Sequence, residues 1–116
     1  DPVLQGPGLT ADLSGEQSDL VLAALYTPEA GVLQITRASG DIPTERAREL
    51  WLIVGEAAPV SLGLLAAGET TEIEISEELR PVLAGAILAV SDEPLGGSPS
   101  GAPTGDVLAV GQILEI

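Results

Sequence analysis

Short apolar segments alternate with residues that break regular structure along almost the whole chain, and this alternation limits the possible folds more than any other feature. The longest uninterrupted apolar run, Val82 to Val90, is far below the roughly 20 residues that a membrane-spanning helix requires. Apolar runs of this length, bounded by Gly and Pro, are typical of β-strands. The chain is therefore expected to fold as a series of short strands joined by turns.

The positions of the expected strands and turns follow from this pattern. We predict about seven strands, in the segments Leu20–Tyr26, Val32–Thr36, Leu50–Val54, Val60–Leu65, Thr70–Ile75, Ala86–Ser91 and Val107–Ile113. The first two enclose a turn that contains Pro and Gly, which predicts a hairpin. One short helical turn is expected from Ser76, because serine is a good N-cap, and Pro81 would prevent a longer helix. The predicted class is all-β, an antiparallel β-sandwich.

The core of such a sandwich must be aliphatic. The 116 residues are enough for one domain with a sizeable core, and 45% of them are hydrophobic, but aromatic residues make up only 2% and Phe is absent. The continuous apolar run from Leu50 to Val54 indicates a strand that is buried on both faces. Trp51, within this run, is the candidate core anchor, with an anchor in a partner interface as the alternative.

The formal net charge of −14 excludes several classes of partner. The basic residues are Arg37, Arg46, Arg48 and Arg80, whereas binding to a phosphate backbone requires clustered Lys or Arg. Nucleic acid is therefore not an expected partner, and an anionic membrane surface is disfavoured for the same reason. We interpret the acidity mainly as a source of solubility.

The residue types that are absent exclude several kinds of nucleophile and a zinc site with nitrogen or thiolate ligands. The chain has no His, Cys or Lys, so Ser–His pairs, Cys–His pairs and Schiff-base lysines cannot form. Adjacent acids at Asp92-Glu93 and Glu77-Glu78 leave a hydrolase with paired carboxylates as an alternative, and Asp92, Glu93 and Asp106 could converge on calcium. We interpret these acids as solvated. No catalytic residue, cofactor or metal ligand is assigned, and the domain is not expected to be an enzyme.

A long connection rich in Gly, Pro and Ser lies near the C-terminus. It follows the apolar run that ends at Ser91 and precedes the last predicted strand, which begins at Val107. Long structureless connections are uncommon in compact domains and are often functional. The candidate interaction residues of this loop are Glu93, Pro94, Gly96, Gly97, Ser98, Pro99, Pro103, Thr104 and Gly105. The alternative is a loop that packs across the end of the sandwich.

The start of the chain indicates a processed protein or a piece of a longer one, because Met is absent at position 1 as elsewhere. Residues 1–10 are rich in Pro and Gly and predict a linker or an extended first strand. Residues 11–116 are expected to form a single domain.

Several ordered motifs resemble the C-terminal domain of anti-sigma-K factors, the extracytoplasmic part of a bacterial transmembrane anti-sigma factor. The resemblance runs from about Glu49 to Gly111 and is carried by Glu49–Ile53, Pro59–Leu65, Leu88–Ser91, Glu93-Pro94, Gly96–Pro99, Pro103–Gly105 and Val107–Ala109. The chain departs from the family pattern at Ser100, where Thr is usual, and at Asp106, where Pro is usual. It departs again at Arg46–Arg48, where an aromatic residue is usual.

The resemblance implies a regulatory role without catalytic residues. The whole protein would hold a sigma factor inactive through an N-terminal domain, and a helix before Asp1 would anchor it in the inner membrane. The present domain would lie on the periplasmic or cell-envelope face and control when proteolysis releases the sigma factor. Its partners would be a regulatory protease or a periplasmic signalling protein. A generic extracellular ligand- or protein-binding module shares the predicted fold and is the alternative function.

Overall fold

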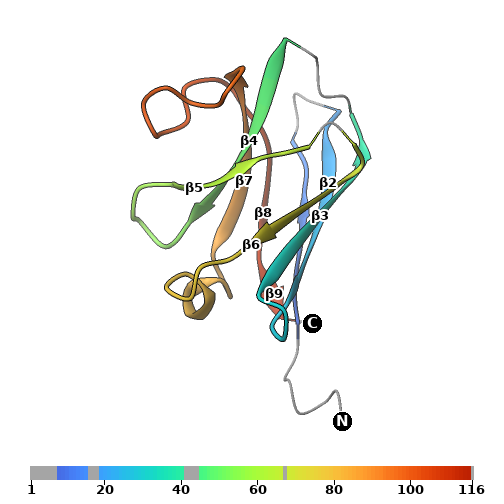
Figure 1. Ribbon diagram of the computed structural model, residues 1–116, viewed down its shortest axis with the longest axis vertical. Helices are drawn as coiled ribbons and strands as arrows, with labels where there is room; N and C mark the ends of the chain where they lie inside the picture. Colours follow the sequence, from blue (N-terminus) through green and yellow to red (C-terminus); the bar gives the residue numbers. More distant parts are fainter. Residues whose placement is uncertain (1–7, 16–18, 41–44, 67, 116) are drawn as a thin grey trace.

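Two antiparallel sheets packed face to face form the domain (Figure 1). The computed structural model describes residues 8–15, 19–40, 45–66 and 68–115. The five-stranded sheet has the order β6 (Thr70–Glu74), β3 (Val32–Ser39), β2 (Val21–Thr27), β1 (Leu9–Leu13) and β9 (Leu114–Glu115). The four-stranded sheet has the order β5 (Val60–Leu64), β4 (Arg46–Ile53), β7 (Ile87–Pro94) and β8 (Val107–Gln112).

The structure confirms the expected all-β sandwich and adds two short strands, β1 and β9, among the described residues. The predicted hairpin is β2–β3, with Gly31 in the left-handed conformation at its turn. The expected helical turn is present as a 3-10 helix at Arg80–Val82, later than the predicted start. Its N-cap is Leu79, and the Ser76 carbonyl accepts from the Leu79 and Arg80 N–H groups instead of a serine side chain capping a helix.

The structure describes only part of the predicted segment at residues 1–10. Residues 1–7 of the predicted linker lie outside the described part of the chain, whereas Leu9 and Thr10 belong to β1. Leu9, Ala11 and Leu13 are buried, and β1 lies between β2 and β9 in the sheet. The described part of this segment therefore agrees with the alternative of an extended first strand, and this strand contributes to the core.

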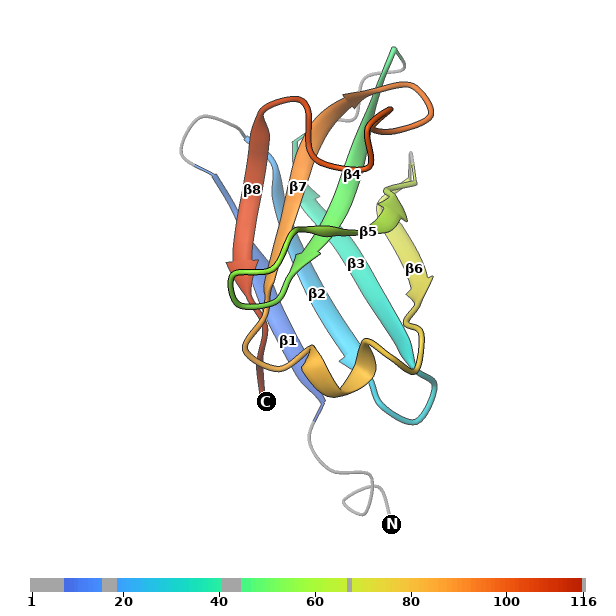
Figure 2. The ribbon, with the colours of Figure 1, turned by 90° about the vertical axis from the view of Figure 1, so that its left-hand side faces the viewer.

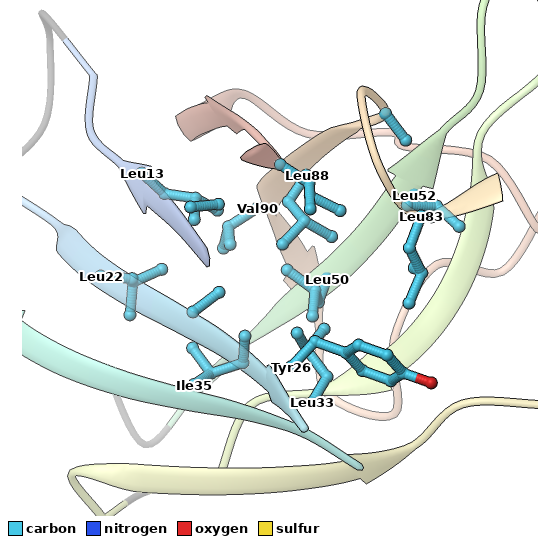
Figure 3. Close-up of a cluster of buried hydrophobic side chains, with 14 of the residues drawn as sticks. Leu13, Leu22, Tyr26, Leu33, Ile35, Leu50, Leu52, Leu83, Leu88 and Val90 are labelled. Atoms are coloured by element: carbon cyan, nitrogen blue, oxygen red, sulfur yellow. The ribbon is translucent and has the colours of Figure 1, made fainter. Parts of the chain in front are cut away.

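The main core lies between the two sheets and is almost entirely aliphatic (Figure 3). Alternate residues of each strand point into it, as the two-residue period of a strand requires. Leu22 and Ile35 come from the five-stranded sheet, and Leu50 and Leu88 from the four-stranded sheet. Tyr26 is the aromatic member of this cluster. The expected aliphatic character of the core is thus observed among the described residues.

One side of the sandwich is closed where β1 meets β8. Ser14 and Val110 exchange two backbone hydrogen bonds, with N···O distances of 3.1 and 2.9 Å. The backbones approach so closely that a Cβ added at Gly111 would overlap the carbonyl oxygen of Asp12. A Cβ at Gly15 would likewise overlap the carbonyl oxygen of Leu108. Glycine at both positions is therefore a condition for closing this side.

The closure at Gly111 can be tested by Gly111→Ala. Because the added methyl group meets backbone atoms that cannot move without shifting β1, we expect the free energy of unfolding to fall by about 1–3 kcal/mol. Urea denaturation followed by circular dichroism measures it. Gly68→Ala is the matched control, since a Cβ there meets nothing within 4 Å. Equal stabilities for the two variants would contradict the close approach.

Candidate functional site

The four-stranded sheet is buried on its outer face as well as on its core face. Leu50 and Leu52 belong to the main core, so Glu49 and Trp51, which alternate with them, point to the opposite face. Trp51 is fully buried there and is not part of the main core cluster. The prediction of a strand buried on both faces is confirmed, and the tryptophan anchors a second buried layer.

The connection between β7 and β8 lies over this outer face. We call residues 95–106 the strap. Figure 2 views the outer face and shows the strap and β5 in front of the rest of the four-stranded sheet. Figure 1 shows the same two segments projecting away from the five-stranded sheet. The strap therefore contributes to the second layer and not to the main core.

Glu93 is the centre of the second layer. It lies near the end of β7 and is fully buried, so the interpretation of this acid as solvated is wrong. Its Oε2 accepts hydrogen bonds from Ser91 Oγ at 2.6 Å, from the Thr104 N–H at 2.9 Å and from the Gly105 N–H at 3.4 Å. Its Oε1 accepts one from the Thr104 hydroxyl. Two of the donor residues belong to the strap, so the carboxylate fastens the C-terminal part of the strap to the sheet.

These donors keep Glu93 ionised. Burial alone would raise the pKa of this carboxyl, because a charge is poorly solvated inside a protein. The hydrogen bonds from Ser91, Thr104 and Gly105 outweigh burial and lower the pKa of Glu93 from 4.5 to about 2. The strap therefore supplies the groups that make a buried negative charge tolerable at this position.

A second carboxylate fastens the other half of the strap. Glu49 on β4 is buried, and its Oε1 accepts the Ser98 N–H at 2.7 Å. Its Oε2 accepts the hydroxyl of Ser61, which lies on β5. A Cβ added at Gly97 would lie 3.1 Å from Glu49 Oε1 and 3.2 Å from a methyl carbon of Leu64. Glu49 thus joins three segments, namely β4, β5 and the strap.

Trp51 is linked to the same network. Its indole Nε1 donates to Ser91 Oγ at 2.8 Å, and Ser91 in turn donates to Glu93. The chain of donors runs from an aromatic ring through a hydroxyl to a carboxylate, so each polar atom in it has a partner. Because this is the single tryptophan of the protein, its fluorescence reports on the second layer.

The other predicted loop residues give the strap its shape. Gly96 and Gly97 adopt φ values of +91° and +95°, which side chains other than glycine rarely allow. The Gly97 N–H donates to the Pro94 carbonyl at 2.9 Å, and the Ser98 hydroxyl donates to the Ala102 carbonyl. A Cβ at Gly105 would overlap the Asp92 carbonyl oxygen. Pro99 is exposed and Pro103 half-buried.

Asp92 points to the opposite face from Glu93 because the two are consecutive strand residues. Its Oδ1 pairs with Arg46 Nε at 3.0 Å and with Arg48 Nη1. Asp92 and Glu93 therefore do not converge, and the described residues contain no group of three or more acids placed to hold a metal ion.

Three anchoring residues lie outside the predicted candidate site. Glu49 enters the sequence prediction only as part of a motif, and Ser61 and Ser91 are not among the candidate site residues. Glu49 carries the signal that could have revealed it, because an acid beside Trp51 in a doubly buried strand must find donors. No comparable signal marks Ser61, whose partner lies across the strand pair.

The fold and the site together define a class: a two-sheet β-sandwich domain with a loop that is anchored by two buried carboxylates. The family model described as "Anti-sigma-K factor rskA, C-terminal" matches residues 2–107, and the chain belongs to this family. The match includes all residues of the anchor and extends well upstream of Glu49. No curated protein and no solved structure matches the chain.

Family membership agrees with a regulatory protein of the anti-sigma class. Across the described ranges, none of the helices has the length and apolarity to cross a bilayer.

The charge of Glu93 makes a pH-dependent contribution to stability. The folded-state pKa lies below the ordinary value, so the contribution is complete above about pH 5 and is lost as the pH falls toward 2. Glu93→Gln is expected to lower the free energy of unfolding at pH 7 by about 2–4 kcal/mol, because it leaves strap donors without a charged acceptor. The difference in the free energy of unfolding between the variant and the wild type should shrink as the pH falls from 5 to 2.

Urea denaturation at a series of pH values measures this difference. Glu72→Gln is the control, because Glu72 is an exposed residue of β6 and its variant should follow the wild-type profile. A Glu93→Gln variant whose stability falls with pH in parallel with the wild type would contradict the role assigned to the carboxylate.

Proposed function

We propose that this chain is the extracytoplasmic regulatory domain of a membrane-bound anti-sigma factor and that it controls the proteolytic release of a sigma factor. The observation that carries the proposal is the family match over residues 2–107. This match includes both buried carboxylates and the strap, and it ends at the start of β8. The sigma factor would be held by another domain of the whole protein. A regulatory protease or a periplasmic signalling protein would be the partner of this domain.

The arrangement of the chain ends supports the proposal. Leu9 and Glu115 are cross-strand neighbours, so both ends of the described chain lie at one end of the sandwich. The strap lies at the other end (Figure 1). A membrane anchor that precedes β1 would therefore place the strap away from the membrane, where a signal could reach it.

The position of β1 suggests how folding would govern proteolysis. Proteases cleave extended, accessible backbone, and β1 is hydrogen-bonded on both sides by β2 and β9. In the proposal, the folded sandwich shields the segment that leads into β1, and a signal or partner weakens that shield. The domain acts by its stability and needs no chemistry of its own.

Deleting the domain tests the regulatory role. In cells that carry the full-length protein, removal of residues 1–116 with the anchor still expressed is expected to change the output of a sigma-dependent reporter. The domain controls release in the proposal, so its loss uncouples release from the signal. An unchanged reporter would remove the regulatory role and favour a binding module.

The shielding mechanism has its own test. Gly111→Ala in the full-length protein is expected to speed cleavage of the segment before Leu9, because the unfolded state becomes more populated. Immunoblotting of the membrane fraction follows the cleavage, and Gly68→Ala is the matched control. Equal cleavage rates in the two variants, with a confirmed loss of stability in Gly111→Ala, would exclude shielding by the fold.

A further inference from the structure

The strap differs from the rest of the domain in what holds it. None of its residues is buried: Leu95 is 65% exposed, and Pro99 to Ala102 are exposed as well. Apolar side chains from the strap therefore add little to its attachment, since an exposed side chain removes little surface from water. The sandwich itself rests on a large cluster of fully buried aliphatic residues.

The attachment of the strap is polar and is concentrated at two carboxylates. Glu49 takes the Ser98 N–H, and Glu93 takes the Thr104 N–H and hydroxyl and the Gly105 N–H. Two backbone hydrogen bonds also link the strap to β7: the Asp92 N–H donates to the Asp106 carbonyl at 2.9 Å, and the Gly97 N–H donates to the Pro94 carbonyl at 2.9 Å. Hydrogen bonds to charged acceptors are strong individually, but they are few in number here.

The two anchors are mechanically connected within the strap. The Ser98 hydroxyl bonds the Ala102 carbonyl, and the Ser100 N–H donates to Ser98 Oγ at 3.3 Å. These bonds shape residues 98–102 as a compact turn between the Glu49 contact and the Glu93 contact. A displacement at one anchor is therefore transmitted to the other.

We propose that the strap is a conformational device that undocks from the sheet as one unit while both sheets remain folded. Segments with few buried apolar contacts open at lower free energy than the core they rest on, and the strap meets this description among the described residues. Undocking removes the strap donors from Glu93, and through Ser91 it alters the surroundings of the Trp51 indole. The opening of the strap does not depend on the proposed function. A role of this opening in receiving a signal rests on the proposed function.

Amide hydrogen exchange on the 116-residue chain tests the opening. At pH 7 the Ser98 and Thr104 amides are expected to share one opening free energy that is lower than that of amides in the β4–β7 ladder. Glu93→Gln is expected to accelerate exchange at Ser98 at least tenfold, although Ser98 donates to Glu49 and not to Glu93. Glu72→Gln, on the exposed side of β6, should leave Ser98 unchanged.

A milder variant keeps the test decisive if Glu93→Gln does not fold. Thr104→Val deletes one hydroxyl donor on an exposed residue and is likewise expected to accelerate exchange at Ser98 by several-fold. Thr36→Val, an exposed threonine of β3, is its matched control. An unchanged exchange rate at Ser98 in Thr104→Val would overturn the proposal that the strap opens as one unit. Strap amides that exchange only together with the β4–β7 ladder would overturn the proposal that the strap opens while the sheets stay folded. Both results would leave the family-based regulatory role standing.

Discussion

The buried carboxylate of Glu93 is the interaction on which the outer half of this domain depends. A charge at a fully buried position is costly unless donors surround it, and the donors here come from Ser91, Thr104 and Gly105. The docked strap therefore stabilises the outer face of the four-stranded sheet. Trp51, fixed through Ser91, depends on the same arrangement. The domain thus combines an aliphatic core between its sheets with a polar layer outside one of them.

The residues of the strap that resemble the family have a physical role in this arrangement. Glu93 is the acceptor, and Thr104 and Gly105 supply donors. The Gly96-Gly97 pair provides the left-handed backbone that the strap requires, and Gly105 allows the strap to pass against the Asp92 carbonyl. These contacts describe how the strap is held against the outer face of the four-stranded sheet. An interaction role for its exposed residues stays a prediction.

The strands with clear periodicity could be predicted from the sequence. The strand predicted at Thr70–Ile75 is observed as β6, and the β2–β3 hairpin follows from its Pro–Gly turn. The start of β1 is predicted only as one of two alternatives, a linker or an extended first strand, because its residues carry weak strand signals and follow a Pro- and Gly-rich start. The anchors were harder still, since Glu93 meets donors 11 and 12 residues away, and Glu49 meets one 49 residues away. Only the folded topology brings such partners together.

The pKa of Glu93 tests this account most directly. Nuclear magnetic resonance can follow the side-chain carboxyl carbon of this residue while the pH is lowered in the folded protein. The account predicts that the carboxyl stays ionised through pH 3, with a pKa of about 2. A pKa at or above the ordinary value of 4.5 would mean that the strap does not supply the donors, and would contradict the account.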